Sequence, residues 1–157
     1  VMRASLRQYR HDFAGALADL DAGLRQDPQH AQALSLMSAI RLVQADYDGA
    51  RVACDRMARV VSPLTAIACT TTIDGLTGKA EAARRRLEQA LEADSDASAA
   101  QRLWVLVRLA EMSWRTGDTA QAERRFRQAL ALDITDGFLL AAYADLLLDA
   151  EIGRAHV

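Results

Sequence analysis

The sequence contains no asparagine, only two prolines and few aromatic residues, and each scarcity narrows the fold class. Proline interrupts helices and asparagine favours turns, so their scarcity beside abundant alanine, leucine and arginine favours helix through most of the 157 residues. Aromatic residues make up 5% of the chain, which means that a core must be built from alanine and leucine packed at close range. Runs of β-branched residues are scarce as well, so we expect no sheet.

An excess of one charge sign is also missing. The net charge of −2 at pH 7 gives no general attraction to nucleic acid or anionic lipid. The longest apolar run, Phe138–Ala144, is far shorter than the ~18 residues of a membrane span. Basic runs at 84–86 and 124–127 are interspersed with glutamates, which predicts solvated helix faces with ion pairs such as Glu81–Arg85. We therefore expect neither nucleic-acid binding nor membrane insertion within this sequence.

Groups that carry catalysis are scarce too. His11 and His30 fall in turns, and no Ser/His/Asp set, glycine-rich phosphate loop or metal-ligand cluster can be assembled. We therefore predict that the chain is not an enzyme and holds no cofactor or metal. Cys54 and Cys69 fall on neighbouring predicted helices, so a disulfide is conceivable. Buried, inert thiols are the preferred interpretation because no CxxC motif is present, and the pairing stays open.

What the sequence does contain is a repeat. An alanine followed four residues later by a larger side chain recurs every 33 to 39 residues, and a turn signal precedes each alanine. The four pairs are Ala16 and Leu20, Ala50 and Cys54, Ala83 and Leu87, and Ala122 and Phe126. A small alanine lets two helices approach closely, while the larger residue lies on the same helix face and fills the gap. Each unit then leaves an apolar face that only its neighbour covers.

A period near 34 with this pattern resembles the tetratricopeptide repeat (TPR), a helix–turn–helix unit. The resemblance covers residues 1–150, and Pro28 matches the closing proline of the repeat, although the tryptophan and Gly-Tyr signature of its first helix is mostly missing. It implies an all-α fold, a right-handed α-α superhelix formed by a TPR-like solenoid of stacked helix hairpins. The predicted units are about 1–30, 31–63, 64–97, 98–136 and a half unit 137–150. The predicted helices after the first are 13–26, 31–44, 48–61, 64–76, 80–93, 98–116, 120–132 and 138–150.

Residues 151–157 are expected to be a non-native tail. One reading frame of a widely used sequencing adapter would encode them, and Glu151 and His156 are the wrong residues for the turn-glycine and small-alanine positions of the repeat. Val1 falls inside a first helix, so we expect a fragment truncated at both ends. The compartment therefore stays open between cytoplasm and periplasm. The arginine-rich, lysine-poor composition favours a bacterial source.

The helix predicted at 98–116 is the most informative segment. Leu103, Leu106 and Leu109 fall on one stripe, which should be the core seam. In TPR proteins the neighbouring positions of each first helix line a concave groove, and the resemblance transfers that role to residues of this helix and the next. The candidate partner-binding residues are Trp104, Val107, Glu111, Trp114, Arg115, Phe138 and Asp145. In the alternative interpretation, both tryptophans fill the gap that the extra residues before this helix open.

Two functions are consistent with these features. The first is a non-catalytic scaffold that binds a protein or peptide on the concave face of the repeat array. The alternative is a regulatory or substrate-recruiting TPR segment of a larger enzyme or regulator whose active domain is missing from this fragment. The lysine and asparagine of the family's carboxylate clamp are absent, since Val107 and Glu111 stand at those positions of their unit. The partner is unidentified, and the exposed face of the last helix also predicts self-association.

Overall fold

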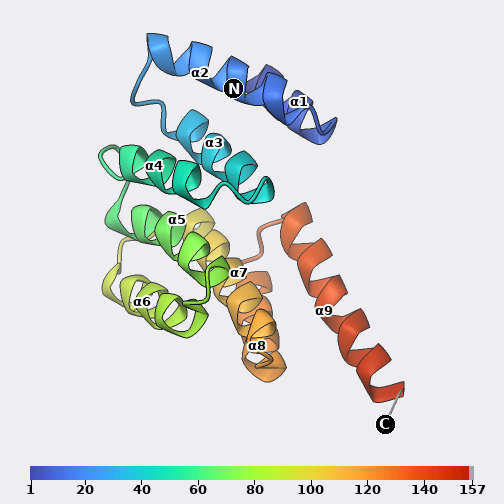
Figure 1. The fold of residues 1–157 in the computed structure, drawn as a ribbon. Helices are drawn as coiled ribbons and strands as arrows, with labels where there is room; N and C mark the ends of the chain where they lie inside the picture. The colour runs from blue at the N-terminus through green and yellow to red at the C-terminus, as the bar shows by residue number, and fades with distance from the viewer. Residues whose placement is uncertain (156–157) are drawn as a thin grey trace. The chain divides into compact units, whose positions relative to one another are not determined.

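The described part of the computed structural model comprises the backbone of residues 1–155 and the side chains of residues 1–151, and it is helical throughout, without a strand (Figure 1). Its helices are α1 (Met2–Tyr9), α2 (Phe13–Gln26), α3 (Ala31–Val43), α4 (Tyr47–Met57), α5 (Pro63–Leu76), α6 (Ala80–Ala93), α7 (Ala99–Arg115), α8 (Thr119–Leu130) and α9 (Gly137–Ala155). The predicted all-α fold is confirmed.

Three of the turns inside the helix hairpins share one construction, and the turn before α6 differs because Lys79 follows Gly78 there without a side-chain cap. A residue with positive φ ends one helix, and an aspartate directly after it caps the next. The pairs are His11 and Asp12 before α2, Ala45 and Asp46 before α4, and Gly117 and Asp118 before α8. Each aspartate accepts a hydrogen bond from the backbone amide three residues later, at 2.9 to 3.0 Å. This bond satisfies an amide that would otherwise lack a partner at the helix start.

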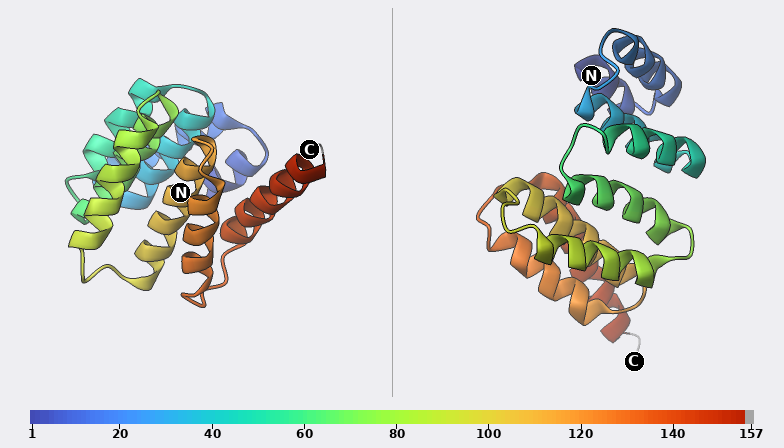
Figure 2. Two further views of the ribbon diagram at one scale, coloured as in Figure 1. Left: turned by 90° about the horizontal axis from the view of Figure 1, so that it is seen from below. Right: turned by 90° about the vertical axis from the view of Figure 1, so that its left-hand side faces the viewer.

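The chain divides into two compact units, the first comprising residues Val1–Ile73 and the second beginning at Asp74. In the first, α3 and α4 lie side by side as a hairpin (Figures 1 and 2). In the second, α7 and α8 form the corresponding hairpin. The alanine and the larger residue of all four sequence pairs are at most 3% exposed, so the repeat pattern marks core positions as predicted. The division into five repeat units remains a prediction.

Cys54 and Cys69 form a disulfide within the first unit, so the interpretation as inert thiols is wrong. Cys54 stands at the larger-residue position of its repeat, and this position faces the neighbouring helix. Cys69 lies on that neighbouring helix, α5, with its Cα atom 5.7 Å from that of Cys54, which is an ordinary separation for a disulfide. The sequence correctly predicted that both cysteines are buried. It did not predict that they stand opposite each other on adjacent helices.

Two helix ends differ from the prediction. Helix α4 ends at Met57 rather than near residue 61, and α9 continues to Ala155 rather than ending near residue 150. Residues 156–157 lie outside the described residues, and the interpretation of 151–157 as a foreign tail remains a prediction.

Candidate partner-binding site

A cavity of about 290 Å³ opens in the second unit between α7 and the start of α9. Helix α7 contributes Ala100, Leu103, Trp104, Val107 and Arg108 to its lining. The connection to α9 contributes Ile134 and Asp136, and α9 itself contributes Phe138. We call this cavity the α7–α9 pocket. Three of the predicted binding residues, Trp104, Val107 and Phe138, therefore line one hollow.

Local capping fixes both helices that form the α7–α9 pocket. At the start of α7 the hydroxyl of Ser98 accepts a bond from the backbone amide of Gln101, and the Gln101 side chain accepts one from the Ser98 amide. At the start of α9 the carboxylate of Asp136 accepts a bond of 2.8 Å from the amide of Leu139. These bonds hold Trp104 and Phe138 on defined helix turns.

The lining is mostly apolar but also contains the charged side chains of Arg108 and Asp136. Phe138 is 52% exposed, and the guanidinium carbon of Arg108 lies 4.7 Å from the centroid of its ring. Arg108 also forms an ion pair with Glu111, with 3.0 Å between Nη1 and Oε2. Asp136 belongs to the same lining. The arrangement can hold an apolar group against an aromatic ring while charges of both signs contact its neighbours.

The Arg108–Glu111 pair is substantially buried, since the two side chains are 20% and 17% exposed. Burial lowers the pKa of Arg108, which Glu111 partly offsets. Burial likewise raises the pKa of Glu111, against the opposing charges of Arg108 and Arg115. Among the described residues, neither Nε of Arg108 nor Oε2 of Glu111 has a hydrogen-bond partner, so their contact is ionic without hydrogen-bond geometry.

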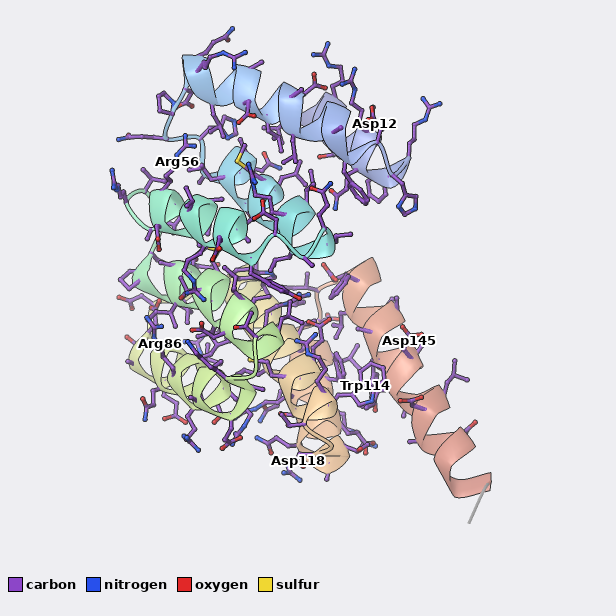
Figure 3. All side chains as sticks on the ribbon, in the orientation of Figure 1. Asp12, Arg56, Arg86, Trp114, Asp118 and Asp145 are labelled. Carbon is purple, nitrogen blue, oxygen red and sulfur yellow. A yellow bond between two sulfur atoms is a disulfide. The ribbon has the colours of Figure 1, made fainter. Side chains whose placement is uncertain are left out.

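The remaining predicted residues lie beside the α7–α9 pocket rather than in its lining. Trp114 is half-buried and packs against the core of the second unit, near α9 in Figure 3. Arg115 and Asp145 are exposed, and Glu111 reaches the lining only through Arg108. The two tryptophans therefore differ, because Trp104 lines the pocket and Trp114 contacts the core. A binding role for the predicted residues remains a prediction.

Sequence reasoning did not select Arg108, Ile134 or Asp136. Arg108 falls between the groove positions that the TPR resemblance supplies, and Ile134 and Asp136 belong to a connection rather than to a helix face. The sequence does contain a signal that could have identified Arg108. Arg108 and Glu111 are three residues apart, and this spacing places opposite charges on one helix face.

Four arginines of the basic runs, Arg84, Arg85, Arg125 and Arg127, form ion pairs with carboxylates. Arg84 contacts Glu81 and Glu88 at 2.8 and 2.9 Å, and Arg85 contacts Glu81 at 2.8 Å, as predicted. Arg125 on α8 reaches Glu88 on α6 at 2.9 Å. Positive charge that is neutralised in this way provides little attraction for phosphate.

The described residues contain no group of three or more histidine, cysteine or acidic side chains placed to hold a metal ion. Over the same residues, no helix combines the length and apolar character that crossing a membrane requires.

No protein-family model and no curated protein sequence matches this chain. Among solved structures, it resembles that of Pseudomonas aeruginosa pilF with a TM-score of 0.65 and 20% identity, over 96% of this chain and 67% of that one. It also resembles a tetratricopeptide repeat protein from Parabacteroides merdae with a TM-score of 0.54 and 14% identity, over 92% of this chain and 68% of that one. The chain thus spans about two thirds of both proteins. Its fold is of the TPR type, as the repeat predicted.

Proposed function

We propose that this chain is a non-catalytic scaffold that binds a protein or peptide through the α7–α9 pocket. The observation that carries the proposal is Phe138, a large aromatic side chain that is 52% exposed at the edge of an apolar cavity. Exposed aromatic residues next to a hollow are typical of binding surfaces, where such side chains provide much of the binding energy.

The size and charge of the α7–α9 pocket indicate the kind of ligand. A volume of about 290 Å³ is at the lower end of the range for ligand cavities, so it suits one large apolar side chain. Asp136 in the lining favours a basic residue next to that anchor, and the exposed acids Asp145 and Asp149 further along α9 add to the negative charge on that side. We therefore propose a peptide with an apolar anchor followed by lysine or arginine.

The other predicted residues would extend this surface. Glu111, Trp114 and Arg115 continue along α7, and Asp145 lies on α9. A peptide longer than the anchor would contact the exposed Arg115 and Asp145, whereas Trp114 would support the surface from the core.

The alternative function uses the same α7–α9 pocket. In a regulatory or substrate-recruiting segment of a larger enzyme, the bound peptide would belong to a substrate or to another domain. The full-length reading frame from the source DNA distinguishes the two functions, because it shows whether a catalytic domain shares the chain.

The proposal is tested by selecting peptides from a display library on the 157-residue chain and measuring their affinity by fluorescence polarisation. Phe138→Ala should weaken binding by roughly 30-fold, the size of a hot-spot truncation. Leu140→Ala is the matched control, since Leu140 is equally exposed on α9 at 52% but does not line the pocket. Equal effects of the two variants, or no effect of either, would contradict the proposal.

A second variant tests the charge. Asp136→Asn keeps an amide oxygen to cap α9 but removes the negative charge. It should abolish the preference for lysine or arginine over glutamine beside the anchor, while leaving the apolar anchor itself required. An unchanged preference would remove Asp136 from the site.

A further inference from the structure

The disulfide between Cys54 and Cys69 joins α4 to α5 at a point where three helices meet. Cys54 is fully buried and Cys69 is 8% exposed. Ser38 on α3 is 3% exposed. Its hydroxyl oxygen lies 3.3 Å from the Cys54 sulfur and 3.7 Å from the Cys69 sulfur. The bond therefore connects α5 covalently to the α3–α4 hairpin in the core of the first unit.

Helix α5 is a poor helix by its own sequence. Thr70, Thr71 and Thr72 follow one another and Gly75 comes near the end, and all four residues are weak helix formers. The threonine hydroxyls donate to backbone carbonyls three or four residues earlier in the same helix, for example from Thr71 to Ile67 at 2.7 Å. Such bonds do not attach the helix to its neighbours, and they compete with regular helix geometry.

Helix α5 joins the core of the first unit partly through the disulfide residue. Cys69 and Ile73 are its members in the core cluster of that unit, and one of them is the disulfide residue itself. A helix with low propensity depends on tertiary contacts for its order. Loss of the covalent bond should therefore affect α5 before it affects the α3–α4 hairpin.

The environment of the sulfurs can accommodate both oxidation states. In the reduced protein the two thiols would face the Ser38 hydroxyl, which can accept a hydrogen bond from a thiol. Two buried thiols next to a hydroxyl leave no charged or strongly polar group without a partner. Reduction therefore breaks the attachment without creating a burial penalty that would unfold the whole unit.

We propose that Cys54 and Cys69 form a thiol–disulfide exchange site whose oxidation fastens α5 to the α3–α4 hairpin. In oxidation the two thiols transfer two electrons and two protons to a disulfide-bearing oxidant, which leaves as a dithiol. In reduction a thiolate of a dithiol reductant attacks the sulfur of Cys69, the more exposed of the two residues, and displaces the Cys54 thiolate, which takes up a proton. The second thiol of the reductant then closes its own disulfide and releases Cys69 as a thiol.

Hydrogen exchange with mass spectrometry tests this inference on the 157-residue chain in oxidised and reduced form. The disulfide closes a loop with a sequence separation of 15, and losing such a closure should speed exchange of the α5 amides by roughly a hundredfold. Helix α2, in the same unit, should keep its exchange rates. The reduced wild type retains both sulfur atoms, so it separates loss of the bond from loss of packing, and Cys54→Ala/Cys69→Ala should behave like it.

Ser38→Ala is the matched control, because it alters the contact with both sulfurs but keeps the bond. In the oxidised form it should leave α5 exchange unchanged. Unchanged α5 exchange after reduction would overturn the inference, and so would equal acceleration in α2. Two free thiols titrated in denaturant after treatment with oxidised glutathione would overturn it as well. None of these residues lines the α7–α9 pocket, so peptide binding and α5 order can fail independently.

Discussion

The guanidinium carbon of Arg108 lies 4.7 Å above the ring centroid of Phe138 and thereby connects α7 to α9. The same guanidinium pairs with Glu111 one turn further along α7. One face of the Phe138 ring is therefore occupied by a cation, while the residue as a whole remains half exposed. The buried ion pair positions the aromatic wall of the α7–α9 pocket, and this makes the pair a test of how the pocket is held together.

Replacing only one member of this pair should be costly. Arg108→Met keeps an unbranched apolar stem but leaves the buried Glu111 carboxylate without Arg108, which should cost about 3 kcal/mol of unfolding free energy. The double variant Arg108→Met/Glu111→Gln removes both charges and should recover most of that loss. Urea unfolding of the two single variants, the double variant and the wild type gives the coupling energy. Additive losses would show that the two residues do not interact.

The loss of unfolding free energy caused by Arg108→Met should depend on pH, and the direction of this dependence follows from the pKa of Glu111. Burial raises the pKa of Glu111 above its unfolded value, so the folded state takes up a proton more readily. Burying the ionised Glu111 carboxylate lowers the stability of the fold at pH values above the raised pKa. This destabilisation disappears as the pH falls through the raised pKa, because the carboxylate takes up a proton. The loss caused by Arg108→Met should therefore be smaller at about pH 5 than at about pH 7, whereas the double variant should show no such difference.

The two tryptophans should separate stability from binding. Trp114 is half-buried and packs against the core of the second unit, so Trp114→Ala should lower the unfolding free energy by about 2 kcal/mol, less than for a fully buried aromatic residue. Trp104→Ala should cost less stability but weaken binding of a selected peptide. Thermal melts and polarisation titrations of both variants check this. If Trp114→Ala folds as stably as the wild type but binds the peptide poorly, Trp114 is a binding residue of the groove and not a core residue.

The fold was predictable from the sequence because its spacing has a physical cause. Close helix packing requires a small residue at one position and a larger one four residues later, so the pairs from Ala16 to Phe126 marked buried positions directly. Most helix bounds followed from the turn signals, since a residue with positive φ and an aspartate cap leave a recognisable pair of letters. The segment predicted as a helix at 64–76 contains three consecutive threonines and a glycine, which are weak helix formers, and it nevertheless forms α5 in the structure.

The site was predictable only in part, for reasons that are equally physical. Groove positions carried over from a repeat describe one helix face, so they found Trp104 and Val107 but not Asp136, which lies in a connection. The cysteine pairing escaped because spacing alone does not show whether two residues on adjacent helices stand at the same level. Both missed predictions depend on how helices are placed relative to each other, and a single sequence carries little information about this placement.

Placing glycine at the left-handed residue of the turn before α4 should stabilise the protein. Ala45 has φ 58° and is exposed, a conformation in which an L side chain is strained and glycine is not. Ala45→Gly should therefore raise the unfolding free energy by up to about 1 kcal/mol, measured by urea denaturation. Gly117→Ala is the reciprocal control, because Gly117 has φ 83° and open space around it, so only backbone strain is introduced. A gain in stability from Gly117→Ala would contradict the strain argument.

The outer face of α9 should make the chain self-associate. Leu147 and Leu148 are 42% and 57% exposed, and Leu140 lies on the same stripe, whereas Leu139 and Leu146 face the core. Contiguous exposed leucines favour pairing of two copies through this face. Sedimentation velocity should show a monomer–dimer equilibrium that moves to monomer in Leu147→Glu. Leu6→Glu, on the exposed face of α1, is the matched control and should leave the equilibrium unchanged if α9 pairs with α9. An equal effect of both substitutions would contradict that pairing, and a chain that stays monomeric at every concentration would remove the α9 interface altogether.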